Sequence, residues 1–137
     1  MLIGVSGRSS AWQRLGSHLR ETNLLGSIQS TLYWDQNTRM PSGGAAWRGE
    51  QLALLARQLH ARQSAASYAD LIAEARQDWR VAIAAAGAAA SPDLVARGRN
   101  LDLLEQDLRR QQALDPDLVS ALATAKAEGY DRWQQAK

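Results

Sequence analysis

The sequence predicts an all-α protein of about five helices, packed mostly antiparallel in a helical bundle. The composition is rich in Ala, Leu, Gln and Arg, which favour helices, and it contains no Phe. Apolar residues recur at spacings of three and four, which places them on one face of a helix. A chain of 137 residues fits one domain. We therefore expect a flexible, Gly- and Ser-rich N-terminus over residues 1–9 and a single helical domain over residues 10–137.

The first helix is expected to begin near Ser10, which can cap it, and to end near Trp34. Met40 precedes Pro41 and is therefore disfavoured in the α region, so a helix should not continue through this point. The segment 33–44 is thus expected to be a loop that turns the chain. The apolar face of the first helix consists of Trp12, Leu15, Leu19, Leu25, Ile28 and Leu32.

Two further helices are expected over about 45–63 and 67–86, where the same spacing continues. The face of the second helix consists of Arg48, Leu52, Leu55 and Leu59, widened by Trp47 and Leu54. The face of the third, which has the clearest periodicity in the chain, consists of Tyr68, Leu71, Ile72, Ala75, Trp79 and Ile83.

The last two helices have explicit start signals. Ser91 and Asp115 can each cap a helix, and each is followed by a proline and then an aspartate, which the helix dipole favours. The fourth helix is expected to end near Leu114. Its apolar side consists of Leu94, Leu101, Leu104 and Leu108, and that of the fifth consists of Leu118, Leu122, Ala125 and Trp133. Four tryptophans are interpreted as packing anchors: Trp12, Trp47, Trp79 and Trp133.

One segment combines aromatic, charged and turn-forming residues at fixed spacing, and it continues into the second helix. It consists of Tyr33-Trp34-Asp35-Gln36, Met40-Pro41, Gly43-Gly44-Ala45, Arg48, Gln51-Leu52-Ala53 and Leu55. Two weaker matches follow at Leu59-His60 and Trp133-Gln134-Gln135-Ala136-Lys137. Together these residues resemble the N-terminal part of the carboxypeptidase Taq family, over roughly Trp12 to Lys137.

The resemblance implies the N-terminal portion of a larger helical zinc metallocarboxypeptidase, an enzyme that removes C-terminal residues from peptides. In the complete enzyme it implies that a zinc-bound water attacks the C-terminal peptide bond and that the N-terminal helices partly cover the substrate channel. The family's His-Glu-x-x-His motif, in which two histidines share a helix face and the glutamate activates the water, is absent from this sequence. We therefore expect this chain to be inactive alone.

Five residues near the expected loop are candidates for the substrate cleft of a complete enzyme: Trp34, Asp35, Gln36, Met40 and Arg48. Each has a structural alternative. Asp35 can hydrogen-bond the turn, and Arg48 can pair with Asp35 or another acid near the start of the second helix. Trp34 and Met40 can be core or interface residues.

No catalytic residue and no metal ligand is predicted within this chain. The two histidines, His18 and His60, lie on different expected helices and are interpreted as ordinary helix-surface residues. A catalytic zinc needs three converging protein ligands. Zinc is therefore expected only for the complete family enzyme.

Composition also limits the classes of partner that the chain is expected to bind. The net charge of +2 comes from charges that alternate in sign, which argues against nucleic-acid binding. The sequence contains no run of about 18 apolar residues, the length that indicates a membrane-spanning helix. Cysteine is absent, so no disulfide is possible, and we expect a cytoplasmic protein. The expected partner is a second copy of the chain or a missing catalytic part. The alternative to an enzyme fragment is a stand-alone helical module for oligomerisation or protein interaction.

Overall fold

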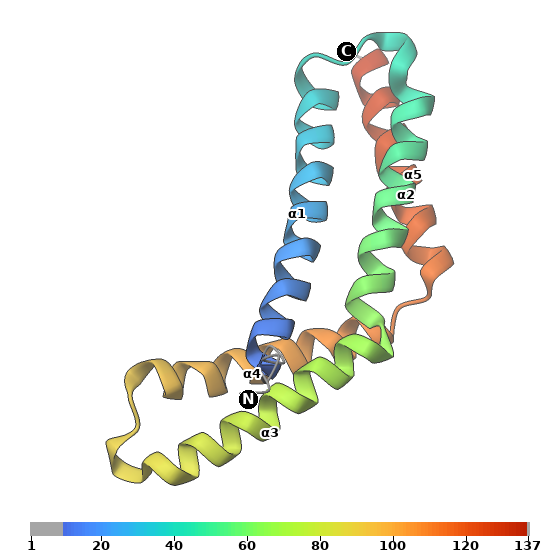
Figure 1. The fold of residues 1–137 in the computed structure, drawn as a ribbon. Coiled ribbons are helices and arrows are strands. Elements are labelled where there is room, and N and C mark those ends of the chain that lie inside the picture. The colour runs from blue at the N-terminus through green and yellow to red at the C-terminus, as the bar shows by residue number, and fades with distance from the viewer. Residues whose placement is uncertain (1–9, 137) are drawn as a thin grey trace, which may run out of the picture.

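The computed structural model describes residues 10–136 and confirms the all-α fold (Figure 1). Within that range the chain forms five α-helices and no strand. The flexible N-terminus expected for residues 1–9 lies outside the described residues. The helices are α1 (Ala11–Thr38), α2 (Ala45–Ser64), α3 (Ala66–Ala86), α4 (Pro92–Gln112) and α5 (Pro116–Gln135), with short 3-10 turns at Ser42–Gly44 and Gly87–Ala89. No helix in the described part of the chain has both the length and the hydropathy needed to cross a membrane.

The predicted helix starts are confirmed by their capping hydrogen bonds. The Ser10 hydroxyl accepts from the Gln13 amide, and the Gln13 side chain accepts from the Ser10 amide in return. The Ser91 hydroxyl caps α4 by accepting from the Leu94 amide. The Asp115 carboxylate caps α5 in the same way. These side chains satisfy amide groups that the first helical turn leaves without backbone partners.

The expected end of the first helix near Trp34 is wrong, because α1 continues through Thr38. Pro41 restricts Met40 but leaves the preceding residues free to remain helical. The helix ends where the amides of Arg39 and Met40 both donate to the Asp35 carbonyl, at 2.8 and 2.9 Å. Much of the segment expected to be a loop is therefore the last part of a helix.

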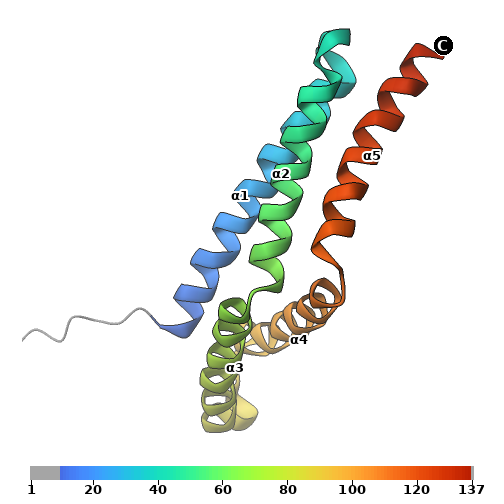
Figure 2. The same ribbon diagram turned by 90° about the vertical axis from the view of Figure 1, so that its right-hand side faces the viewer.

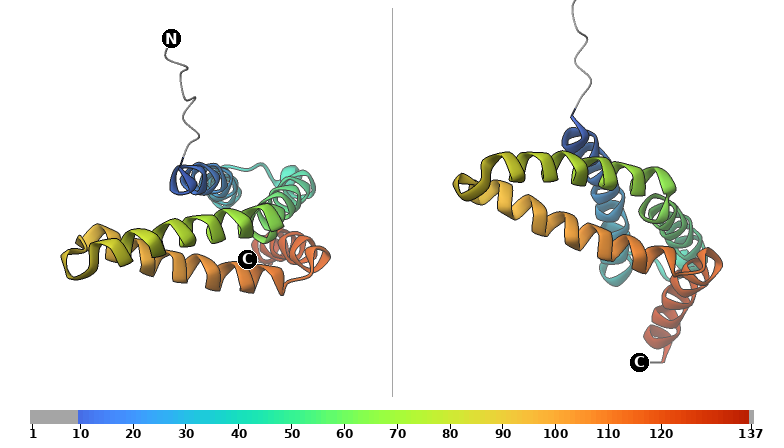
Figure 3. Two further views of the ribbon diagram at one scale, coloured as in Figure 1. Left: turned by 60° about the horizontal axis from the view of Figure 1, so that its bottom comes forward. Right: turned by 90° about the horizontal axis from the view of Figure 1, so that it is seen from below.

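The helices form two groups. Helices α1, α2 and α5 run side by side, with α2 in contact with both of the others (Figures 1 and 2). Helices α3 and α4 form a hairpin that lies across the beginning of α1 (Figure 3). Consecutive helices in each group run antiparallel, as does α5 against α2, which agrees with the predicted packing. Gly87, with a φ of 52°, ends α3 at the turn of this hairpin.

The main hydrophobic core lies where α1 crosses the hairpin. Leu15 of α1, Ile72 of α3 and Leu101 of α4 are almost fully buried there. Trp12 and Trp79 pack against this cluster, as predicted for packing anchors. Leu52 of α2 is also fully buried, outside this cluster. Because the cluster contains residues of α1 and of both hairpin helices, it joins the two groups of helices.

The prediction that Trp47 and Trp133 are packing anchors is wrong for the described chain. The exposed fractions of Trp47 and Trp133 are 67% and 52%. Ile28, assigned to the apolar face of α1, is also exposed.

The apolar side predicted for α5 is also wrong as a buried face. Leu118 and Leu122 are 58% and 52% exposed. Helix α5 instead packs on α2 through Ala123 and Ala127, and a Cβ placed on Gly49 of α2 would lie 3.9 Å from the Ala127 Cβ. Small residues on both helices permit this close approach. Periodicity identified an apolar face of α5 but not which face meets α2.

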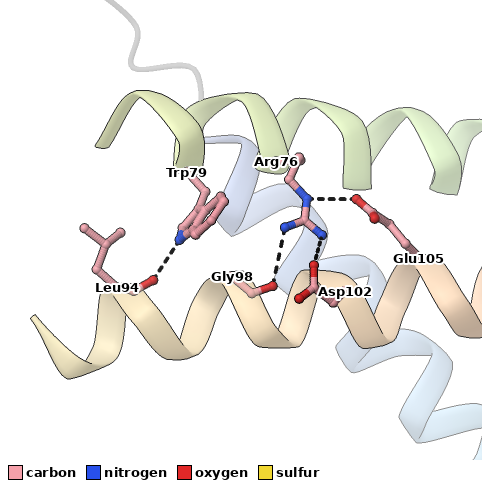
Figure 4. A network of polar contacts seen from close by, with 6 residues as sticks. All are labelled: Arg76, Trp79, Leu94, Gly98, Asp102 and Glu105. Atoms are coloured by element: carbon pink, nitrogen blue, oxygen red, sulfur yellow. Dashed lines mark hydrogen bonds and ion pairs between the residues drawn. The ribbon is translucent and has the colours of Figure 1, made fainter. Parts of the chain in front are cut away.

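Arg76 links α3 to α4 through three acceptors (Figure 4). Its Nε donates to Glu105 Oε1 at 2.8 Å, and its Nη2 donates to Asp102 Oδ1 at 2.8 Å. Its Nη1 donates to the Gly98 carbonyl at 3.4 Å. The hydrogen bonds that Arg76 donates to the two carboxylates, that to Glu105 first, raise the pKa of its guanidinium. The guanidinium therefore remains charged and spans the hairpin.

Gly98 of α4 lies directly against the Trp79 ring of α3. A Cβ added there would lie 2.4 Å from a ring carbon of Trp79 (Figure 4). The ring is held in place because its Nε1 donates to the Leu94 carbonyl at 2.8 Å. The indole therefore fills the space that any side chain at this position would need.

We predict that Gly98→Ala destabilises the protein by up to about 2 kcal/mol, because the helix-propensity gain of about 1 kcal/mol offsets only part of the overpacking cost of about 1–3 kcal/mol. Urea unfolding monitored by circular dichroism measures the change. Gly129→Ala is the control, because no atom lies within 4 Å of a Cβ built there. The control should be neutral or stabilising, and an equal gain from Gly98→Ala would contradict the assigned contact.

Candidate functional site

The five candidate residues lie in the last turns of α1, in the connection to α2 and in the first turn of α2, but the structure does not bring them to one point. Asp35 and Arg48 form one pair. Gln36 and Met40 line one cavity. Trp34 is 62% exposed and belongs to neither group, so its reading as a core residue is wrong for the described chain. Whether any of them contacts a substrate stays a prediction.

Arg48 joins α2 to the last part of α1. Its Nη2 lies 2.6 Å from Asp35 Oδ2, and its Nη1 donates to the Leu32 carbonyl at 2.5 Å. Its Nε donates to Gln51 Oε1 at 2.9 Å. The Arg48 side chain is 12% exposed, so these charged hydrogen bonds are largely shielded from water. The pairing of Arg48 with Asp35 is thus the alternative that the structure shows.

Gln36 joins α1 to α5 and is only 6% exposed. Its Nε2 donates to the Ala127 carbonyl at 3.2 Å, whereas its Oε1 is buried and accepts no hydrogen bond from any described residue. A buried polar atom without a partner costs about 1–3 kcal/mol. Such a cost is tolerated where the arrangement serves another purpose.

Gln36 and Met40 line a cavity of about 410 Å³ between the end of α1 and the last turns of α5. Tyr130, Asp131 and Gln134 form the α5 side of this cavity. Met40 also packs against Gly44, where an added Cβ would lie 3.1 Å from the Met40 Cγ. Two of the five sequence candidates are therefore placed where a small polar ligand group could enter.

A second cavity, of about 780 Å³, lies between α2 and α5 and was not anticipated from the sequence. Trp47 and Leu54 provide apolar surface, and Glu50, Glu128 and Asp131 provide carboxylates. These residues come from helices far apart in the chain. No local motif links them, so only the packing of α5 on α2 reveals the cavity.

The residues present do not fit a zinc site. Within residues 10–136 no group of three His, Asp or Glu side chains is arranged to hold a metal ion. His18 stacks on Tyr68, with ring centroids 4.5 Å apart, and His60 Nδ1 lies 3.3 Å from Gln111 Oε1. The reading of both histidines as surface residues is wrong for His60, which is buried. Sequence position alone did not indicate that α4 covers this residue.

Burial acts on both rings of the His18–Tyr68 stack. It lowers the pKa of His18, and the nearby Arg62 charge lowers it further. Burial also raises the pKa of Tyr68, with a further contribution from the Asp107 carboxylate. His18 Nε2 is buried and has no hydrogen-bond partner among the described residues. The neutral forms of both rings are therefore favoured in the folded chain.

Comparisons with known proteins identify relatives of this chain. Residues 14–137 match the family model described as carboxypeptidase Taq (M32) metallopeptidase. The thermostable carboxypeptidase 1 of Thermus thermophilus is 29% identical over 128 residues, which are 93% of this chain and 23% of that protein. The chain thus spans about a quarter of the length of this relative. No solved structure matches the chain significantly.

We predict that Arg48→Met destabilises the protein by about 2–3 kcal/mol, because charged hydrogen bonds are lost and Asp35 is left partly buried without its cation. Urea midpoints at neutral pH measure the change. Arg110→Met is the control, since Arg110 pairs with Asp107 at 3.2 Å on an exposed helix surface. The control should shift stability by less than about 0.5 kcal/mol, and equal effects would contradict a special role for Arg48.

We predict that stability falls as the pH drops below the ordinary histidine pKa of 6.5, through the lower pKa of folded His18. In this window the unfolded chain binds the proton more readily than the folded chain does, so protonation favours unfolding. His18→Phe retains an aromatic ring against Tyr68 but cannot titrate. Urea midpoints measured between neutral and acidic pH should therefore change less in the variant, and identical pH profiles would refute the assignment.

Proposed function

Because the chain belongs to the carboxypeptidase Taq (M32) metallopeptidase family, we propose that it supplies a non-catalytic helical portion of a zinc carboxypeptidase. The complete enzyme would remove C-terminal residues from peptides. This chain would contribute the N-terminal helices that partly cover the substrate channel. On this proposal the chain alone is inactive.

The observation that carries the proposal is the contrast between the family match and the missing ligand set. The match covers residues 14–137, yet the described residues do not group three possible metal ligands. A catalytic zinc requires such a group and an open coordination position for water. The Thermus relative is about four times as long, so the missing ligands would be supplied by the part of a complete enzyme that this chain does not contain.

Two features support a position beside the substrate channel. The Asp35–Arg48 ion pair holds the α1–α2 turn in a defined shape. Beside that turn, Gln36 and Met40 line a cavity together with polar residues of α5. We propose that this end of the molecule faces the peptide substrate in the complete enzyme. We also propose that the protein is cytoplasmic, because a chain without cysteine does not depend on an oxidising compartment for disulfides.

A second candidate function is self-association as a helical interaction module. Large apolar side chains on three helices favour it, since Trp34, Trp47 and Trp133 are each more than half exposed. Burying such side chains yields about 1.5–3 kcal/mol each. A second copy of the chain could provide the required surface.

We predict that the purified chain binds less than stoichiometric zinc and releases no C-terminal amino acid from a blocked peptide, even with zinc supplied. Equilibrium dialysis with metal analysis measures the first quantity, and chromatography of the released amino acid measures the second. The Thermus relative serves as the positive control for the peptidase assay. Stoichiometric zinc that is lost in His18→Ala or His60→Ala would contradict the proposal, as would release above the blank.

A further inference from the structure

A groove of about 840 Å³ lies between α1 and α5. These two helices flank α2 (Figure 2). Residues from all three helices line the groove. Gly26 contributes from α1, Ala56 and Leu59 from α2, and Leu122 and Ala123 from α5. Small residues on all three helices keep the groove open. The three helices are therefore arranged as a bundle with room for a fourth.

The α5 wall of the groove continues into an exposed apolar surface. Leu122 of α5 and Leu114, in the connection between α4 and α5, line the groove, whereas Leu118 of α5 lies outside its lining. All three are exposed in this chain. Leu118 and Leu122 are four residues apart and so lie on the same side of the helix. An exposed apolar surface beside a groove is a surface on which an amphipathic helix can pack.

We propose that this groove receives an amphipathic helix from the part of an M32 peptidase that this chain lacks. The inference rests on the proposed function. It is supported by the relative's length, because the segment that corresponds to this chain is 23% of a single polypeptide in which the rest is available to cover it. Packing a helix between α1 and α5 would bury the Leu114 and Leu122 side chains, which line the groove.

The lining also defines the chemistry of the incoming helix. Lys126 lies on the α5 side of the groove, and no carboxylate occurs among the described residues that line it. Gln29, Gln63 and Gln111 add amide groups to the walls. The matching helix would therefore present an apolar stripe toward Leu59 and Leu122, with an acidic residue near Lys126.

Gly26 offers a way to close the groove without disturbing the fold. No atom lies within 4 Å of a Cβ built at Gly26, so a side chain there would enter open space. Leu is also a better helix former than Gly, so Gly26→Leu should keep α1 intact. Gly16→Leu is a matched control. It makes the same change in the same helix, again with no atom within 4 Å, at a position outside the groove lining.

The test uses the unmatched part of the Thermus carboxypeptidase as the binding partner, co-expressed as a separate polypeptide with this chain. Co-purification and titration calorimetry measure the complex, and light scattering measures the size of this chain alone. We expect the parent chain and Gly16→Leu to bind, and Gly26→Leu to bind at least about tenfold more weakly, a difference of about 1.4 kcal/mol. Circular dichroism of both variants verifies that they are folded.

The alternative results have separate meanings. Equal binding by Gly26→Leu and Gly16→Leu would overturn the groove as the docking site and leave the proposed function standing. Dimers of the parent chain that Gly26→Leu dissociates would overturn the inference by assigning the groove to a second copy. Failure of the parent chain and both variants to bind a Thermus part that circular dichroism shows to be folded would overturn the proposed function as well.

Discussion

The contact among Leu15, Ile72 and Leu101 determines how the two groups of helices lie relative to each other. These side chains come from α1, α3 and α4 and are almost fully buried together. Each would lose about 1.5–3 kcal/mol if returned to water. The contact positions the start of α1 on a hairpin that Arg76 and Trp79 already hold together. Because α1 continues from this point to the α1–α2 turn, the position of the candidate site depends on it.

The packing of α5 on α2 follows a different physical rule. The interface includes Gly49, Ala123 and Ala127, small residues that permit close approach of the two helices. The hydrogen bond from Gln36 to the Ala127 carbonyl adds a polar contact from α1. As a result the larger side chains of α5 face outward. The same geometry produces the cavities beside α5 and leaves its leucines available to another polypeptide.

The helix starts and the buried face of α3 could be predicted because the interactions that set them act between residues close in sequence. The caps at Ser91 and Asp115 act within one helical turn, and the stripe containing Ile72 and Ala75 has a single buried face. The end of α1 could not be placed, since Pro41 sets only an outer limit on the helix. The burial of His60, the exposure of Trp47 and the choice of the buried face of α5 depend on which helices meet. The Arg48–Asp35 pair could be proposed as one alternative, whereas the α2–α5 cavity has no signal in either segment alone.

The long sequence separation across the α2–α5 interface has a consequence for the order of folding. The α1–α2 and α3–α4 hairpins join neighbouring segments, whereas the Gln36–Ala127 hydrogen bond joins residues 91 positions apart. Closing a longer loop costs more chain entropy, and contacts between distant segments form more slowly. Helix α5 would thus associate with α2 after the α1–α2 and α3–α4 hairpins have formed.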